Sequence, residues 1–135
     1  MSDNNGMIQS VECFKCKEKF TVSKENTVFE KQYKGKNGQT IFITYFDCPK
    51  CQERHYVQID NNSTLDIKKE TMKMFAVVSA KKLAGKSIPK QQLNKFEKLR
   101  KKLSDRRFEL MNQYNDAIVT DTETGADVAI HFTVM

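Results

Sequence analysis

Along the first 60 residues, hydrophobic and polar residues alternate in short runs typical of β-strands. Two runs, 27–33 and 39–46, are rich in β-branched and aromatic residues. The segment Lys-Gly-Lys-Asn-Gly at 34–38 has strong turn-forming character, so the two runs are predicted to pair as a β-hairpin. Shorter segments at 20–22 and 55–59 predict further strands on either side of that hairpin.

From about residue 66 the apolar positions recur with a helical period. A first helix is expected from Asp66, as its N-cap, to about Ala84. Gly85 is expected to end this helix, and 61–63 is expected to be the linker that precedes it.

A second helix is expected over 87–114, with Ser87 as its N-cap. Pro89 falls in the first turn, where its missing N–H leaves no helical hydrogen bond unmade. Because only Gly85 and Lys86 connect the two helices, they are predicted to fold back on each other antiparallel.

The second helix is predicted to be amphipathic. Its apolar stripe, which spans about 120° at about 100° per residue, consists of Leu93, Phe96, Leu99, Leu103, Leu110 and Tyr114. The opposite side carries Lys95, Lys98, Lys101 and Lys102. These lysines indicate either a solvated face, with Glu97 pairing with Lys101, or a surface that contacts nucleic acid.

Arg100 and Arg107 fall within the apolar sector of the second helix. We expect their aliphatic stems to lie along the edge of the core, with each guanidinium in water or paired with an acid from elsewhere in the chain. The alternative is that they anchor an acidic group of a partner.

The centre of the first helix is apolar on all sides, through Met72, Met74, Phe75, Ala76, Val77, Val78 and Ala80. A helix of this kind is buried on several sides, and one neighbouring helix covers only one of them. We expect ordinary core, with strands covering the remainder. The alternative is an interface with another subunit or a partner protein, for which Met74, Phe75 and Val78 are the candidate residues.

The last 20 residues predict two short strands, 117–120 and 127–134, around a Thr-Glu-Thr-Gly turn. They are expected to pair as a hairpin that packs on the rest of the chain. The predicted fold class is α+β, with a flexible segment 1–10, a β-rich segment 11–62, a basic helical hairpin 63–115 and a C-terminal β-hairpin 116–135.

Charge is distributed unevenly along the chain, whose formal net charge is +6. The first 64 residues contain 9 basic and 8 acidic residues, residues 65–115 contain 14 and 5, and the remainder contains 4 acidic and no basic residues. The positive charge therefore belongs to the helical segment. No apolar run approaches the roughly 20 residues that span a bilayer. The polar N-terminus lacks the pattern of a signal peptide, so a cytoplasmic protein is expected.

The four cysteines form two matched pairs, Cys13-Phe-Lys-Cys16 and Cys48-Pro-Lys-Cys51. A two-residue gap lets both thiolates of a pair reach one ion from a tight turn. Two such turns complete a tetrahedral site with four sulfur ligands. One structural Zn(II) ion is therefore predicted.

Other uses of the cysteines fit the sequence less well than zinc binding. Iron suits the same ligands, although such iron sites usually have Gly after the second Cys of each pair, where this chain has Lys17 and Gln52. Two disulfides fit a reducing compartment poorly. Redox chemistry by two pairs separated by a β-rich stretch is equally unfavoured.

Over about residues 11–60, the chain resembles the zinc-ribbon superfamily. The resemblance lies in the order of its parts: a cysteine pair, a hairpin, a second cysteine pair and a returning strand. The resemblance implies ligation of zinc by Cys13, Cys16, Cys48 and Cys51, and it implies no particular function, because zinc ribbons occur in many unrelated proteins. A β-sheet of about 50 residues buries too little apolar surface to be stable alone, so the metal is expected to supply the missing stabilisation.

Motifs for catalysis are missing from the sequence. It has no Gly-rich phosphate loop and no Gly-x-Ser-x-Gly, and its two histidines, His55 and His131, lie in no metallopeptidase or deaminase motif. Four thiolates leave zinc no position for water, unless His55 replaces one of them. A non-enzymatic protein without a small-molecule substrate is expected.

Nucleic-acid binding is the leading functional hypothesis. Phosphate contacts need cations and unpaired bases stack on aromatic rings. The residues that suit these contacts are Lys95, Lys98, Lys101 and Lys102 on the second helix and Lys15, Lys17, Lys50, Arg54, Phe14 and Tyr56 near the cysteines. The alternative is a protein-interaction or assembly module, as in a bacterial virus. It would bind a partner or a second copy through the apolar first helix.

Overall fold

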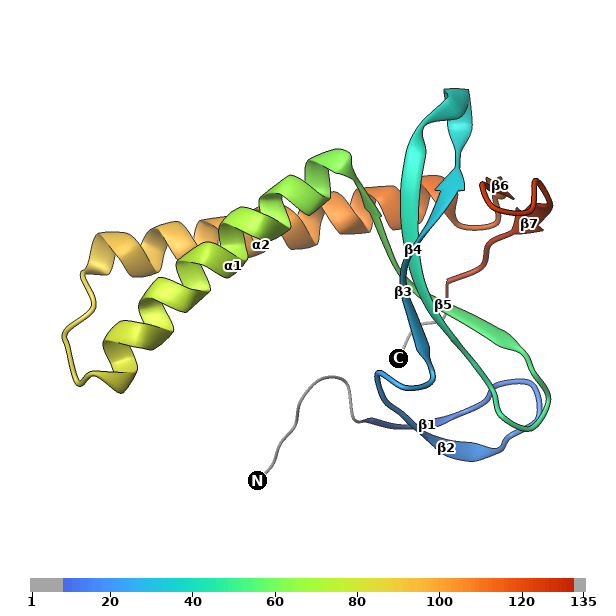
Figure 1. Ribbon diagram of the computed structural model, residues 1–135, viewed down its shortest axis with the longest axis horizontal. Coiled ribbons are helices and arrows are strands. Elements are labelled where there is room, and N and C mark those ends of the chain that lie inside the picture. The colour runs from blue at the N-terminus through green and yellow to red at the C-terminus, as the bar shows by residue number, and fades with distance from the viewer. Residues whose placement is uncertain (1–8, 133–135) are drawn as a thin grey trace. The chain divides into compact units, whose positions relative to one another are not determined.

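The computed structural model describes residues 9–132 and has a mixed α+β fold (Figure 1). Its strands are β1 (Gln9–Glu12), β2 (Lys19–Val22), β3 (Thr27–Lys34), β4 (Thr40–Asp47), β5 (Arg54–Asn61), β6 (Ile118–Asp121) and β7 (Asp127–Ala129). Its helices are α1 (Asn62–Leu83) and α2 (Lys90–Tyr114), with a short 3-10 turn at Lys36–Gly38. The chain divides into two compact units, one of residues up to 59 together with those from 111 onward, and one of residues 60–110.

The first unit contains two sheets. β1 and β2 form a two-stranded antiparallel sheet, and the other strands form a sheet in the order β5-β4-β3-β6-β7. The predicted hairpin over 27–33 and 39–46 is confirmed as β3 and β4, with Tyr33 opposite Ile41. The core of this unit consists of the fully buried side chains Val22, Tyr33, Ile41, Ile43, Phe46, Ile59, Tyr114, Val119 and Ile130.

The turn between β3 and β4 approaches the end of α2 closely. The hydroxyl of Tyr114 accepts a hydrogen bond from the backbone N–H of Lys36 (3.0 Å) and donates one to Oε1 of Gln39 (2.8 Å). A Cβ atom at Gly35 would lie 2.6 Å from Cε1 and 2.7 Å from Cζ of Tyr114. Because the φ of Gly35 is −101°, glycine is required there for space rather than for backbone conformation.

β6 and β7 form the expected C-terminal hairpin and extend the larger sheet, since β6 pairs antiparallel with both β3 and β7. Lys31 on β3 reinforces this edge through ion pairs with Asp121 (3.5 Å) and Glu123 (2.6 Å). The second strand is shorter than predicted, because β7 ends at Ala129. Residues 133–134, which belonged to the predicted strand, lie outside the described residues.

α1 begins directly after β5, earlier than predicted. The side chain of Asn61 accepts a hydrogen bond from the N–H of Thr64 (2.9 Å), and the hydroxyl of Thr64 accepts one from the N–H of Asn61 (2.8 Å). This reciprocal pair satisfies two backbone donors at the start of the helix. The prediction of Asp66 as N-cap, with 61–63 as a linker, was therefore wrong.

Gly85 ends α1, as predicted. It adopts a φ of 70°, its N–H donates to the carbonyl of Lys82 (3.1 Å), and the N–H of Lys86 donates to that of Lys81 (2.9 Å). This pair of hydrogen bonds is the Schellman arrangement, which glycine favours because it tolerates a left-handed backbone.

α2 begins at Lys90, so the prediction of Ser87 as its N-cap was wrong. The carbonyl of Pro89 accepts hydrogen bonds from the N–H groups of Gln92 (3.0 Å) and Leu93 (3.2 Å), which places Pro89 immediately before the helix rather than within its first turn. Proline suits this boundary, because it lacks an N–H of its own.

The two helices run antiparallel, as predicted (Figure 1). The ring of Phe75 lies 6.0 Å from that of Phe96, and Nζ of Lys81 donates to Oε1 of Gln92 at 2.8 Å. The buried side chains of the helical unit are Asp60 just before α1, Thr64, Ile67 and Val78 on α1, and Leu103 and Leu110 on α2.

The expectation that α1 is covered on all sides was wrong. Met72 is 60% exposed, Phe75 58% and Val77 42%. Within the unit of residues 60–110, α2 covers one side of α1, and a single helix cannot cover a residue set distributed around the whole circumference.

Candidate metal centre

The four cysteines converge on one point. The first pair lies between β1 and β2 and the second between β4 and β5. All four sulfur atoms lie within 4.8 Å of one another, with Sγ–Sγ distances of 3.6 Å between Cys13 and Cys51 and 3.5 Å between Cys16 and Cys48. A tetrahedron of thiolates at a metal–sulfur distance of about 2.3 Å has edges of about 3.8 Å. The four cysteines could therefore hold one metal ion.

The backbone of the two cysteine turns is the same. The N–H of Lys17 donates to the carbonyl of Cys13 (2.8 Å), and the N–H of Gln52 donates to that of Cys48 (3.0 Å). Lys17 and Gln52 have φ values of 66° and 65°, a left-handed conformation that glycine adopts most readily. The missing glycines therefore do not distinguish zinc from iron, because the backbone reaches the same conformation without them.

Hydrogen bonds within each turn favour the thiolate form of its first cysteine. Burial raises the pKa of the Cys48 thiol, but hydrogen bonds from the backbone of Cys51 and Lys50 and from neighbouring thiols outweigh it and lower the pKa to about 7. Burial also raises the pKa of the Cys13 thiol, and the equivalent backbone hydrogen bonds, with one from the His55 side chain, produce a net lowering. The thiolate is the form that binds a metal.

The second cysteine of a turn shows why a cation is needed. The backbone N–H of Glu53 lowers the pKa of the Cys51 thiol, but burial and the neighbouring thiols of Cys16 and Cys13 raise it to about 12. Four thiols this close cannot all ionise without a compensating positive charge. A metal ion held by the four cysteines would supply that charge and favour deprotonation of the remaining thiols.

Two ion pairs join the turns crosswise. Nζ of Lys15, in the first turn, lies 3.3 Å from Oε1 of Glu53, which follows the second. Nζ of Lys50, in the second turn, lies 3.7 Å from Oε1 of Glu18, which follows the first. Both turns carry the repeat Cys-x-Lys-Cys-x-Glu. Each lysine therefore reaches the glutamate of the other turn.

Aromatic rings pack beside the sulfur atoms. His55 is 2% exposed, stacks on Phe46 at 5.0 Å between ring centroids and meets the edge of Phe14 at 5.1 Å. Among residues 9–132, the set of side chains close enough to share an ion consists of the four cysteines. His55 thus lies next to the sulfur cluster and does not replace a cysteine in it.

Three of the four basic residues near the cysteines, Lys15, Lys50 and Arg54, are already paired with acids, whereas exposed Lys17 makes no ion pair with the described residues. Lys50 takes part in a crossed pair, and Nε of Arg54 donates to Oδ1 of Asp47 at 2.9 Å, which raises the pKa of the guanidinium. Arg54 also lies 3.9 Å over the ring of Tyr45. Tyr56, expected to offer an exposed ring for stacking, is only 7% exposed, so that expectation was wrong.

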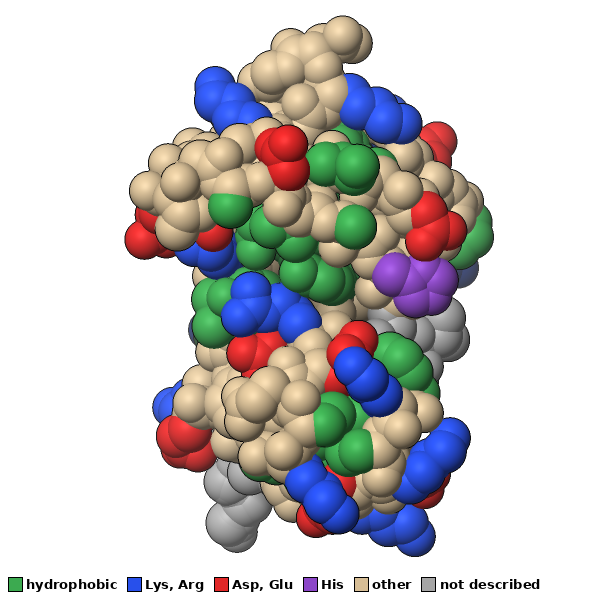
Figure 2. Space-filling view, turned by 90° about the vertical axis from the view of Figure 1, so that its right-hand side faces the viewer, with side chains coloured by type: hydrophobic (Ala, Val, Ile, Leu, Met, Phe, Trp, Pro, Cys, Tyr) green, Lys and Arg blue, Asp and Glu red, His purple; other side chains and the backbone are tan. Residues whose placement is uncertain are grey.

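The lysines on the predicted basic side of α2 are exposed: Lys95, Lys98, Lys101 and Lys102. Lys101 pairs with Asp105 at 2.8 Å, which raises the pKa of its ammonium group, and the predicted Glu97–Lys101 pair was wrong. Lys98 and Lys102 make no ion pair with any residue that the structure describes. Figure 2 shows a face on which Lys and Arg side chains lie among Asp and Glu side chains.

Both arginines in the apolar sector of α2 pair with an acid of the chain, one of the arrangements expected for them. Arg107 makes two hydrogen bonds to the buried carboxylate of Asp60, at 2.7 Å and 3.2 Å. Arg100 pairs with Glu97 at 3.2 Å and lies 5.6 Å over the ring of Phe96.

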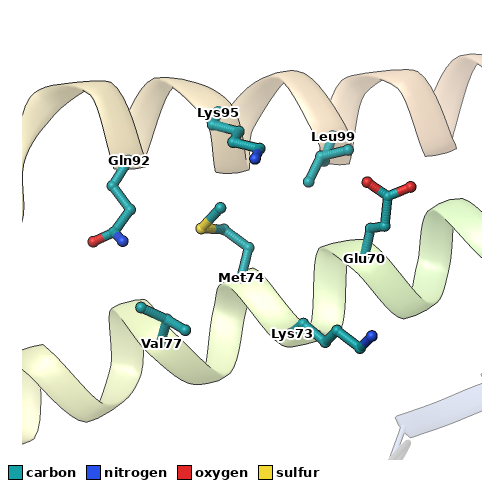
Figure 3. A pocket seen from close by; sticks show the side chains of 7 residues that line it. All are labelled: Glu70, Lys73, Met74, Val77, Gln92, Lys95 and Leu99. Atoms are coloured by element: carbon teal, nitrogen blue, oxygen red, sulfur yellow. The ribbon is translucent and has the colours of Figure 1, made fainter.

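The three candidate interface residues on α1 have different surroundings. Val78 is 8% exposed and belongs to the core of the helical hairpin, so its assignment to an interface was wrong. Phe75 is exposed although it touches Phe96. Met74 is half-buried and lines a groove between the helices, opposite Leu99 (Figure 3).

The sequence analysis missed the acidic partners of the cysteine turns, Glu18 and Glu53. Alignment of the two turns would have revealed them, because the glutamate stands two positions after the second cysteine in each. It also missed the groove between the helices. No local signal marks it, since its lining residues come from two helices and meet only in the folded hairpin.

Comparison with protein-family models, characterised proteins and solved structures finds no match to this chain. No helix within residues 9–132 is both long and apolar enough to cross a membrane.

Proposed function

We propose that this is a non-enzymatic protein built on a zinc ribbon, in which one structural Zn(II) ion is held by the four cysteines and the helical hairpin binds another protein. The observation that carries the proposal is the exposure of Met72, Phe75 and Val77 at the centre of α1. Met72 and Phe75 stand three residues apart and so share one side of the helix. Contiguous exposed apolar surface is typical of protein-interaction sites.

The sulfur cluster supports the choice of zinc and of a structural role. Sites with four thiolates are a common form of structural zinc site in proteins, and they leave no open position for water or substrate. Elemental analysis of the purified protein is expected to find one zinc per chain and no visible absorbance from iron. One iron per chain, with a coloured protein, would contradict the zinc assignment.

The interaction role can be tested by photocrosslinking from α1. A benzophenone amino acid at position 72 is expected to form discrete adducts with protein in cells that express the chain. The same group at position 101, on an exposed and ion-paired site of α2, serves as the matched control. Adducts that are equal at the two positions, or lacking at both, would contradict the proposal.

Nucleic-acid binding is a second candidate, favoured by one observation. Lys98 and Lys102 are exposed, stand one turn apart on α2 and make no ion pair with the described residues. Binding of a labelled duplex, measured by anisotropy, is expected to weaken steeply with salt if this surface contacts phosphates. The double variant Lys98→Ala/Lys102→Ala should then reduce the salt slope by about 2. Unchanged binding in that variant would show that Lys98 and Lys102 do not contact the duplex.

A further inference from the structure

A groove of about 250 Å³ runs between α1 and α2 (Figure 3). Met74 points from α1 toward α2, and Leu99 points from α2 toward α1. Together with Val77 they supply the apolar part of the lining. The groove therefore offers an apolar surface that other residues of the helical unit leave accessible.

Charged residues border the apolar surface. Lys73 from α1 and Lys95 from α2 line the groove, together with Glu70 and the amide of Gln92. Glu70 is the single carboxylate in the lining, so the ammonium groups outnumber it. The local field therefore favours an anionic occupant.

The basic side of α2 continues beyond the groove. Lys98 and Lys102 follow Lys95 at three and seven residues, a spacing that keeps all three on one side of a helix. Lys73, Lys95, Lys98 and Lys102 make no ion pair with the residues that the structure describes. These cations are available to a partner, unlike Lys101 and Arg107, which already hold acids.

We propose that this groove binds an acidic amphipathic segment of another protein, whose apolar side chains contact Met74, Val77 and Leu99 while its carboxylates face Lys73 and Lys95. The inference rests on the proposed interaction role of the hairpin and names the chemistry of the partner. Apolar contacts supply affinity in such a complex, and opposite charges supply orientation and speed of association.

Alternative occupants fit the groove less well. Nucleic acid would use the lysines, but the lining contains no aromatic ring on which a base could stack. The acidic C-terminal hairpin of a second copy is a poor match, because Asp121 and Glu123 are already paired with Lys31 and Asp116 with His131. A separate chain with unpaired carboxylates is the better complement.

The test uses the full, zinc-loaded chain and a fluorescein-labelled helical peptide composed of Leu, Phe and Glu in an amphipathic order. The control peptide has Lys at every Glu position. Anisotropy is expected to show saturable binding of the acidic peptide and at least tenfold weaker binding of the basic one. Equal binding of the two peptides, or none of the acidic one, would overturn the proposal.

Two variants locate the binding site. Val77→Asp places a carboxylate in the groove and is expected to weaken the acidic peptide at least tenfold. Leu83→Asp places a carboxylate at a position of α1 that is 90% exposed and lies roughly 120° around the helix from Val77, and it should leave the affinity within twofold. Lys95→Glu gives a second variant in the groove and is expected to weaken binding by a similar factor, with circular dichroism confirming that each variant is folded.

Equal losses in Val77→Asp and Leu83→Asp would place binding outside the groove and overturn the assignment. A second outcome would also overturn the proposal. In that outcome the protein binds a DNA duplex or phosphatidylglycerol vesicles but not the acidic peptide, and Val77→Asp abolishes that binding. The crosslinking experiment tests the proposed interaction role separately. If crosslinks from position 72 are observed but the peptide does not bind, the interaction role stands and only the assignment to the groove is rejected.

Discussion

The guanidinium of Arg107 holds the carboxylate of Asp60 in two hydrogen bonds, of 2.7 Å and 3.2 Å, and that carboxylate is completely buried. The hydroxyl of Thr64 donates a third, at 2.8 Å. Asp60 stands just before α1 and Arg107 on the C-terminal half of α2, so the group closes the end of the hairpin opposite the turn at Gly85.

Replacement of Arg107 by Met is expected to destabilise the helical hairpin by about 3 kcal/mol, because it removes two charge-assisted hydrogen bonds from a buried carboxylate. Urea unfolding of the zinc-loaded protein, followed by circular dichroism at the helical minimum, measures the change. Arg100→Met is the matched control and should cost less than about 1 kcal/mol, since the Arg100–Glu97 pair is exposed. Equal costs in the two variants would show that burial of Asp60 contributes nothing.

Removal of the metal is expected to unfold the β-rich unit. The binding energy of a structural zinc ion is on the order of 10 kcal/mol, more than a small sheet gains from its own core. A strong chelator should therefore collapse the dispersed NMR signals of Tyr33 and Ile43, and Cys16→Ser should show the same loss without chelator. Retention of these signals in the metal-free protein would refute a folding role for the ion.

The crossed pairs Lys15–Glu53 and Lys50–Glu18 are expected to slow release of the ion rather than to determine the fold. Both pairs are exposed, and exposed pairs contribute about 1 kcal/mol or less. Lys15→Glu with Lys50→Glu should therefore speed transfer of the metal to a chelator by about two- to fivefold at low salt. Adding Glu53→Lys and Glu18→Lys returns the net charge to its wild-type value with both pairs reversed and should restore the slower rate. A rate that stays fast in this variant would contradict a role for the pairs.

A side chain at position 35 is expected to displace Tyr114. Gly35→Ala should cost about 1–3 kcal/mol, the usual cost of forcing an extra methyl into a packed site, as measured by thermal unfolding. In combination with Tyr114→Leu, which removes the ring atoms that the methyl would meet, the cost of Gly35→Ala should shrink. Strict additivity of the two substitutions would contradict the steric explanation.

The hydroxyl of Tyr33 is expected to reduce stability. It is fully buried and makes no hydrogen bond with the described residues, and an unsatisfied buried polar group costs about 1–3 kcal/mol. Tyr33→Phe should therefore raise the urea midpoint of the zinc-loaded protein. A lower midpoint in this variant would mean that the hydroxyl has a favourable partner.

The same burial affects the pH dependence. It raises the pKa of Tyr33 to about 12, above the ordinary phenol value of 10.0. The pKa of Tyr33 is higher in the folded than in the unfolded state. The free energy of unfolding is therefore unaffected by this titration below about pH 10 and decreases as pH rises from about 10 toward 12. Absorbance at the tyrosinate band is expected to lose one late-titrating phenol in Tyr33→Phe, while the phenol of Tyr56, whose pKa burial also raises, still titrates above the ordinary range.

Much of the metal centre and of the strand pattern could be predicted because the signals are local. Two Cys-x-x-Cys spacings predict the four cysteines that converge in the fold, and the turn-forming segment at 34–38 predicts the β3–β4 hairpin. Helix starts were placed less well for the same local reason. Asn61 and Asp66 are both good N-caps, and the reciprocal bond between Asn61 and Thr64 selects the first.

What the sequence determined by itself was therefore the set of four converging cysteines, the helical hairpin with its Gly85 turn and the amphipathic character of α2. Only the tertiary structure decided which charged and apolar residues remain available. Arg107 is paired by Asp60, an acid distant along the chain, and Arg54 by Asp47 on the other side of the second cysteine turn. Tyr56 is buried, and Met72 and Val77 remain exposed. Exposure and pairing depend on which surfaces meet in three dimensions, and no periodicity along one segment contains that information.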